Sequence, residues 1–142
     1  MPALGTVTVV GLIAAVVLIW VYLKMRRSDM LGELVEKRRA SSKLVSRAEY
    51  VEGVEHLPVA LALTEDTFYY ENPDLQASFE LNRIDQIEYD DELATGTTVA
   101  QGQRVLRLRS HGVTFEFILS PADAQKWQAV LAPARGEHAR AV

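Results

Sequence analysis

Residue types that perform catalysis are present in this 142-residue chain, but they are scattered along the sequence. The three histidines, His56, His111 and His138, fall in separate segments, so no two share the spacing that zinc ligands need on one element. The absence of cysteine excludes disulfides and thiolate metal sites. No serine lies in a G-x-S-x-G turn, and no glycine-rich loop is followed by Lys-Ser/Thr. We therefore expect no catalytic residue, no cofactor and no metal ion, and predict that the chain is not an enzyme.

Carboxylates are densest between Glu88 and Glu92, where Asp90 and Asp91 also lie. A calcium-binding loop would need the D-x-D-x-D-G spacing, which this run lacks. Because successive residues of a strand point to opposite faces, the run of carboxylates is not expected to converge on one ion. The sequence favours a solvated acidic edge, which also discourages edge-to-edge pairing of strands.

Arginines form one basic stripe at Arg104, Arg107 and Arg109, on a predicted strand. Arg107 and Arg109 share a face and could hold a carboxylate or phosphate through paired hydrogen bonds, so they are the candidate anion or partner contacts. The interpretation that the sequence favours is that they pair with acids on a neighbouring strand, such as Glu116.

The segment Leu4 to Leu23 (LGTVTVVGLIAAVVLIWVYL) contains no charged residue. Twenty helical residues span about 30 Å, the thickness of a hydrocarbon core. Lys24, Arg26 and Arg27 follow at once, and no basic residue precedes the segment, so the positive-inside rule places the N-terminus outside and the following domain in the cytoplasm. A cleaved signal peptide would carry its positive charge first. We predict an uncleaved single-pass anchor in the inner (cytoplasmic) membrane of a bacterium.

Small residues at Gly11 and Ala15 could bring two copies of this helix together as a weak homodimer, although small residues are common in membrane helices. Beyond the helix, residues 24–47, which we name the basic collar, carry a net charge of +5, and the rest of the chain carries −9. The candidate membrane-surface contacts in the collar are Lys24, Arg26, Arg27, Lys37, Arg38 and Arg39. The alternative is that collar charge only fixes topology. Nucleic acid is not an expected partner of an acidic, tethered domain.

The pattern of apolar residues divides the chain into a transmembrane anchor (1–27), a juxtamembrane basic helix or linker (28–48), a β domain with a C-terminal helix (49–132) and a flexible tail (133–142). After Tyr50, apolar and polar residues alternate in about six short runs, which predicts antiparallel strands. Those runs are 59–63, 68–71, 77–81, 87–92, 104–109 and 113–119, and residues 93–103 have the composition of a mobile loop.

A helix is predicted after the last strand. Ser120 can cap it, Pro121 suits its first position, and Asp123 stands where a capping box places its acid. An apolar stripe that includes Trp127 would cover one end of the sheet. The predicted fold class is α+β: a membrane helix and juxtamembrane helix, then a mainly antiparallel sheet or barrel capped by a C-terminal helix.

The order of these elements resembles the pleckstrin-homology-like superfold in its bacterial PH or GRAM-like forms. The segments that carry the resemblance are PVALALTEDTFYYENP, SFELNRIDQIEY, RVLRLRS and VTFEFILS, followed by the helix with Trp127, and together they cover roughly residues 50–132. The resemblance implies a binding module rather than an enzyme.

Many members of that superfold bind phosphoinositides through basic residues in the first hairpin loop. The corresponding loop of this sequence, Thr64-Glu65-Asp66-Thr67, is acidic and would repel phosphate. We therefore expect protein binding, through an edge strand or the groove beside the terminal helix. The predicted function is a membrane-tethered cytoplasmic interaction or scaffold module. The alternatives are a lipid-sensing module and an enzyme without a recognisable motif.

Overall fold

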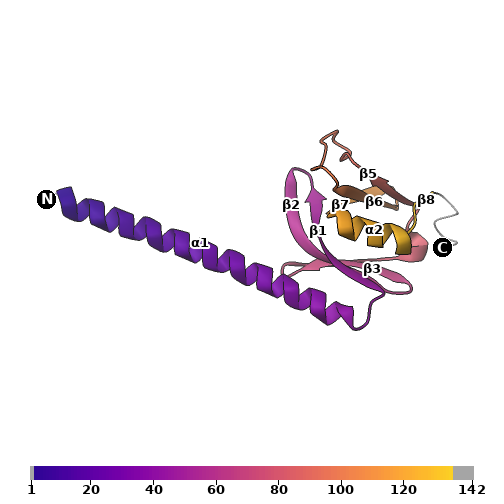
Figure 1. Cartoon of the computed structure of the whole chain (residues 1–142), viewed down its shortest axis with the longest axis horizontal. Coiled ribbons are helices and arrows are strands. Elements are labelled where there is room, and N and C mark those ends of the chain that lie inside the picture. The colour runs from indigo at the N-terminus through magenta and orange to yellow at the C-terminus, as the bar shows by residue number, and fades with distance from the viewer. Residues whose placement is uncertain (1, 136–142) are drawn as a thin grey trace.

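The computed structural model describes residues 2–135, in which one long helix precedes an antiparallel sheet and a short C-terminal helix (Figure 1). The fold class is α+β, as predicted. The helices are α1 (Pro2–Arg39), the 3-10 turn η1 (Leu81–Arg83) and α2 (Pro121–Val130). The strands are β1 (Leu44–Glu52), β2 (Glu55–Leu63), β3 (Thr67–Asn72), β4 (Leu75–Glu80), β5 (Gln86–Asp90), β6 (Arg104–Ser110), β7 (Val113–Leu119) and β8 (Ala134–Arg135).

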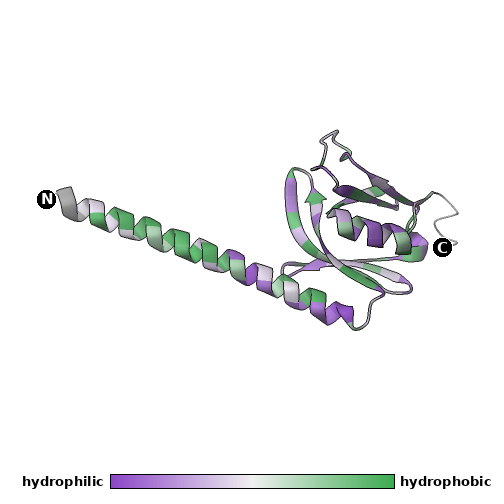
Figure 2. Ribbon diagram, viewed as in Figure 1, coloured by the Kyte–Doolittle hydropathy of each residue, from purple (hydrophilic) through white to green (hydrophobic). Residues whose placement is uncertain are grey.

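The long helix α1 is uninterrupted over 38 residues, so the predicted anchor and juxtamembrane helix form one element as far as Arg39. At 1.5 Å per residue it is about 57 Å long. Within the described residues, its segment Gly5–Arg39 is the one helix long and apolar enough to cross a membrane. Hydrophobic residues surround its N-terminal half, and hydrophilic residues gather where it approaches the sheet (Figure 2). A helix that is apolar on every side suits a lipid environment.

All strands belong to one eight-stranded sheet in the order β4-β3-β2-β1-β7-β6-β5-β8. Each strand from β1 to β4 pairs with the next one in the chain, and so does each strand from β5 to β7. The pairing of β1 with β7 joins the two groups. Every pairing is antiparallel. The sheet curls into a half-barrel with β4 and β8 at its edges, and α2 lies inside the curl (Figure 1).

Strand β1 corrects the predicted domain boundary, because the sheet begins at Leu44 and not at residue 49. β1 pairs with β2 over its full length. The alternation of apolar residues along β1 is broken by Ser46, which is buried and accepts a 2.8 Å hydrogen bond from Trp127 Nε1. A polar residue on the core-facing side conceals the two-residue period that predicts a strand.

The core lies between the concave face of the sheet and α2. Trp127 is fully buried and packs edge-on against Phe68, with ring centroids 5.5 Å apart. The helix begins as predicted: Pro121 is its first residue, and Ser120 Oγ accepts a hydrogen bond from the backbone N–H of Asp123. This cap fixes the direction in which α2 enters the half-barrel.

The hairpin turn at His111-Gly112 joins β6 to β7, with positive φ at both residues, and η1 separates β4 from β5. Residues 93–103, expected as a mobile loop, fold back through backbone hydrogen bonds, and Leu93 is buried against Val105. A buried leucine gives this loop an anchor that its polar composition does not indicate.

Candidate functional site

The last turns of α1 pack on the outer face of the sheet and so connect the long helix to the β domain. Leu31 and Val35 are buried against Ala60 of β2, and Leu34 and Val45 border this contact. Large and small residues alternate along β2. The large side chains face the core on one side of the sheet, and on the other side the small Ala60 lets α1 approach closely. We name this contact the junction.

Arg38 closes the junction electrostatically. Its Nε donates to Glu71 Oε1 at 2.7 Å and its Nη2 donates to Oε2 at 3.2 Å, a paired arrangement with fixed geometry. The guanidinium carbon also lies 4.2 Å from the ring centroid of Tyr69. The Glu71 side chain is 5% exposed and that of Arg38 is 30% exposed. The hydrogen bonds with Glu71 raise the pKa of Arg38, so the guanidinium stays charged.

These contacts correct one predicted role. Arg38 belongs to the junction and is not free to contact lipid head groups, as the sequence allowed. Its neighbours Lys37 and Arg39 remain exposed, and Arg39 makes a 3.4 Å pair with Glu36. The role of Glu71 was not anticipated, because a pair 33 residues apart leaves no local signal in the sequence.

The acidic cluster and the arginine stripe meet on the outer face of β5, β6 and β7. Arg107 Nη1 lies 3.2 Å from both Glu88 Oε2 and Asp90 Oδ2, and its Nη2 donates to Glu116 Oε2 at 3.1 Å. Nη2 also donates to the backbone oxygen of Glu92 at 2.8 Å, and Nε donates to Glu116. The predicted pairing of Arg107 with Glu116 is confirmed.

This arrangement changes two expectations about the cluster. Glu88 and Asp90, two residues apart, share a face, so these carboxylates do converge, and on an arginine. Each nitrogen of the Arg107 guanidinium already donates to, or pairs with, an acceptor, and three carboxylates surround it, so Arg107 is not the anion contact that the sequence allowed. Arg109 is exposed and pairs in register with Thr114 and Gln86, so its predicted role in partner contact stays a prediction.

Hydrogen bonding perturbs one carboxylate of this cluster. The backbone N–H of Asp91 is the main cause that lowers the pKa of Asp90, and the Arg107 side chain adds to it. An acid with a lowered pKa stays ionised at neutral pH and is not poised as a proton donor. The cluster therefore has the properties of an ion-pair network that ties three strands together.

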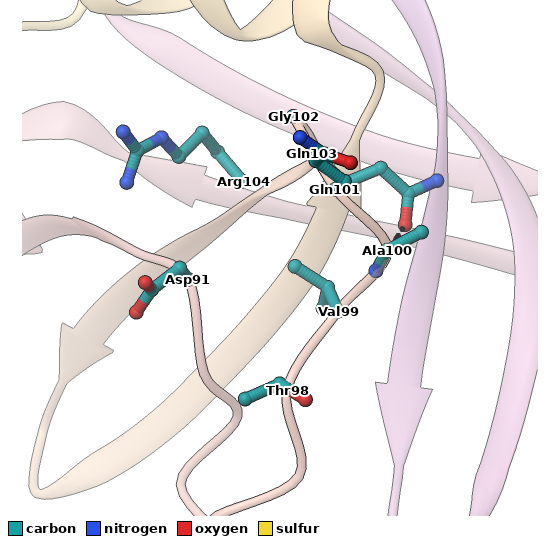
Figure 3. A pocket seen from close by; sticks show the side chains of 8 residues that line it. All are labelled: Asp91, Thr98, Val99, Ala100, Gln101, Gly102, Gln103 and Arg104. Carbon is teal, nitrogen blue, oxygen red and sulfur yellow. Dashed lines mark hydrogen bonds between the residues drawn. The ribbon is translucent and has the colours of Figure 1, made fainter.

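The loop between β5 and β6 borders an open hollow of about 310 Å³ (Figure 3). Asp91 lies on one side and Arg104 on another, and the rest of its lining comes from the turn at Thr98–Gln103. Gln103 Oε1 accepts a hydrogen bond from the backbone N–H of Ala100, so part of this polar surface is already satisfied. The lining of the hollow contains one carboxylate and one guanidinium and no nucleophile paired with a general base, which gives it no evident chemistry.

The two histidines within residues 2–135 lie on different elements. His56 is an exposed residue of β2 whose Nδ1 lies 3.3 Å from Glu49 Oε2, and His111 lies in the β6–β7 turn. His138 lies outside the described residues. Across residues 2–135, no group of three or more metal-ligating side chains is close enough to hold an ion.

Aromatic side chains line the concave face at the end of the half-barrel. The Tyr70 ring lies 5.1 Å from Tyr50 and stacks on Phe79 at 5.5 Å, and Phe79 contacts Phe115 at 4.6 Å. Burial raises the pKa of Tyr70 to about 12. These tyrosines therefore stay neutral through the physiological range and serve as packing groups.

The first hairpin loop also requires correction. Since β1 precedes β2, the first hairpin turn is Gly53-Val54, and the turn Thr64–Asp66 joins β2 to β3. Glu52 and Glu55 flank the true first turn, so it too is acidic. The argument against inositide binding there holds for the corrected loop.

No family model, no curated protein and no solved structure matches the chain. The arguments that follow therefore depend on the geometry of this chain.

Proposed function

We propose that this protein is a membrane-tethered interaction module, in which α1 anchors a cytoplasmic β domain that binds a partner protein. The large apolar side chains from Val7 to Leu23 are exposed, an arrangement that water would disfavour and a bilayer would not. Lys24 lies 5.1 Å from the Trp20 ring, a pair suited to the membrane interface.

The orientation in the proposal follows from the collar. Lys24, Arg26 and Arg27 follow the apolar segment directly and would keep the C-terminal side in the cytoplasm of a bacterial inner membrane. The two exposed basic residues Lys37 and Arg39 lie about 15 Å farther along a continuous helix, beyond a Debye length of about 8 Å. The collar is thus divided, and only its first three basic residues are proposed to contact head groups.

A pleckstrin-homology-like assignment is part of the proposal. Two antiparallel groups of strands, joined through β1 and β7 and closed by a C-terminal helix, support it. Domains of that architecture bind partners more often than they catalyse reactions.

The observation that carries the proposal is the junction. Buried Leu31 and Val35, together with the Arg38–Glu71 pair, hold the domain against the proposed anchor. A tether that fixes orientation presents the same surface to every partner at the membrane, and anchoring raises the effective concentration of both.

The test is cross-linking in native membranes, followed by capture of the full-length chain. A reproducible partner that is cross-linked to wild type, and less to a Leu31→Asp variant with a detached domain, would support the proposal. The absence of any reproducible partner would contradict it.

Lipid sensing is the second candidate, favoured by Lys24, Arg26 and Arg27 alone. It predicts that the full chain alters the composition of anionic lipid around it and that replacing acidic surface residues leaves this unchanged. Co-sedimentation of a soluble fragment with anionic liposomes would separate the two roles, and that fragment must begin before Leu44 because β1 starts there. Strong, salt-sensitive sedimentation would favour lipid sensing.

A further inference from the structure

The two edges of the sheet differ in how they are covered. At one edge, the chain places its own strand β8 beside β5, pairing Ala134 with Ile87 and Arg135 with Gln86. At the other edge, β4 pairs with β3 on one side and has no strand on its other side among the described residues. An edge strand of this kind exposes a row of backbone donors and acceptors.

The register identifies which backbone groups are exposed. β3 and β4 are joined by the two-residue turn Pro73-Asp74, so the flanking pair Asn72↔Leu75 exchanges backbone hydrogen bonds and the pattern then alternates. The N–H and C=O groups of Gln76 and Ser78 therefore point away from β3. They form a ready template for one more strand.

β4 lacks the features that normally protect an edge strand. Its six residues contain no lysine and no proline, and its register with β3 runs without a bulge from Thr67↔Glu80 to Asn72↔Leu75. One charged residue, Glu80, stands at its end and pairs with Arg83 at 3.1 Å. A long unprotected edge is either an aggregation hazard or a binding site.

The apolar side of β4 is incompletely covered. Leu75, Ala77 and Phe79 are each half-buried, whereas the equivalent residues of the next strand, Phe68 and Tyr70, are buried. An added strand with apolar residues at alternate positions would cover this side. Removal of this apolar surface from water would favour binding.

Charge at the two ends of β4 specifies the partner further. Asp74 precedes the strand, and the backbone oxygen of Asp66 accepts from the N–H of Leu81, which places the acidic turn Glu65-Asp66 beside the other end. Both ends therefore favour basic residues in the added segment, with a dependence on salt.

A second copy of the chain is the alternative occupant of the same edge. Two copies would then pair through their β4 strands, and protection of this edge would depend on the number of copies and not on an added peptide.

We infer that β4 is the docking edge for an extended segment of a partner protein, with apolar residues at alternate positions and basic residues at its ends. The segment adds to the sheet as a further strand through the exposed backbone groups of Gln76 and Ser78. This inference rests on the proposed interaction function and assigns it a place and a partner chemistry.

The test uses the full chain in phosphatidylcholine nanodiscs and a phage-displayed library of linear peptides as the probe. The matched variants are Ser78→Pro, which removes an N–H that does not bond to β3, and Ser78→Ala, which keeps it. Selected peptides should show the alternating, basic-ended pattern and bind wild type and Ser78→Ala equally. Loss of this edge hydrogen bond should weaken binding to Ser78→Pro about fivefold.

Hydrogen exchange provides a readout that does not depend on the folding of Ser78→Pro. In wild type, a selected peptide should slow exchange at the amides of Gln76 and Ser78. Three results would each overturn the inference. The first is that no peptide is enriched over empty nanodiscs, and the second is that peptides bind a folded Ser78→Pro variant as well as wild type. The third is that Ser78 becomes protected without any peptide when each nanodisc holds more copies of the chain. A partner cross-linked equally to Ser78→Pro would leave the proposed function intact and overturn the docking edge.

Discussion

The two ends of α1 have the same backbone and opposite surroundings. From Val7 to Leu23 the large apolar side chains are exposed, whereas Leu31 and Val35 are buried against the sheet. The difference lies in the periodicity of the side chains: the first part is apolar on all sides, and the second has an apolar stripe and a charged remainder. One continuous helix can therefore serve two environments, and the proposed anchor is coupled mechanically to the domain.

The largest expected effect comes from breaking the docked end. Leu31→Asp would lose a buried leucine and place an unpaired charge at the junction, at a cost of about 4 kcal/mol in docking free energy. Met30→Asp is the matched control, because Met30 is 40% exposed and the substitution introduces the same charge one residue away. Hydrogen exchange of the last α1 turns is the measurement, and equal effects of the two variants would contradict the junction.

The second expectation concerns the end of the apolar segment. Replacing Lys24, Arg26 and Arg27 with glutamine should remove about 1 kcal/mol of surface attraction per residue. Lys37→Gln with Arg39→Gln should have little effect, because these residues lie about 15 Å farther from the surface. Protease accessibility of the domain in oriented vesicles measures the change. A larger effect of the distal pair would show that α1 lies along the surface.

A third, smaller effect tests the electrostatic part of the junction. Arg38→Ala leaves Glu71 buried without its partner and should cost about 2 kcal/mol, less than a fully buried pair because Arg38 is 30% exposed. Arg39→Ala removes an exposed pair with Glu36 and should change stability by less than about 0.5 kcal/mol. Denaturant unfolding of the two variants measures the difference in stability. Indistinguishable midpoints would show that Arg38 does not stabilise the junction.

The fourth expectation separates the junction from the aromatic core by pH. The pKa of Tyr70 is raised from 10.0 to about 12, so its neutral form stabilises the fold fully below pH 10 and this stability is lost between pH 10 and 12. Tyr70→Phe should remove that alkaline loss and leave the docking of α1 unchanged, since Arg38 stays charged there. Ultraviolet absorbance of tyrosinate, measured as the pH rises in wild type and in Tyr70→Phe, checks the raised pKa of Tyr70. Ionisation of Tyr70 near pH 10 would contradict it.

Local signals in the sequence predicted six strands, α2 and its cap, because each depends on neighbours in the chain. They also predicted the pairing of Arg107 with Glu116, which follows from the register of a single hairpin. β1 escaped prediction because Ser46 interrupts its apolar face to bond Trp127. The Arg38–Glu71 pair escaped because it forms only once α1 crosses the sheet.

The measurement that tests the central claim most directly is the distance between α1 and the domain in a bilayer. The chain has no cysteine, so Ser28→Cys and Thr114→Cys introduce the only two labelling sites for spin labels. Both positions are exposed, one on α1 before the junction and one on β7. Pulsed electron paramagnetic resonance in nanodiscs should give one narrow distribution of distances between the two labels. Leu31→Asp should broaden that distribution. A broad distribution in the otherwise wild-type chain would contradict a rigid junction.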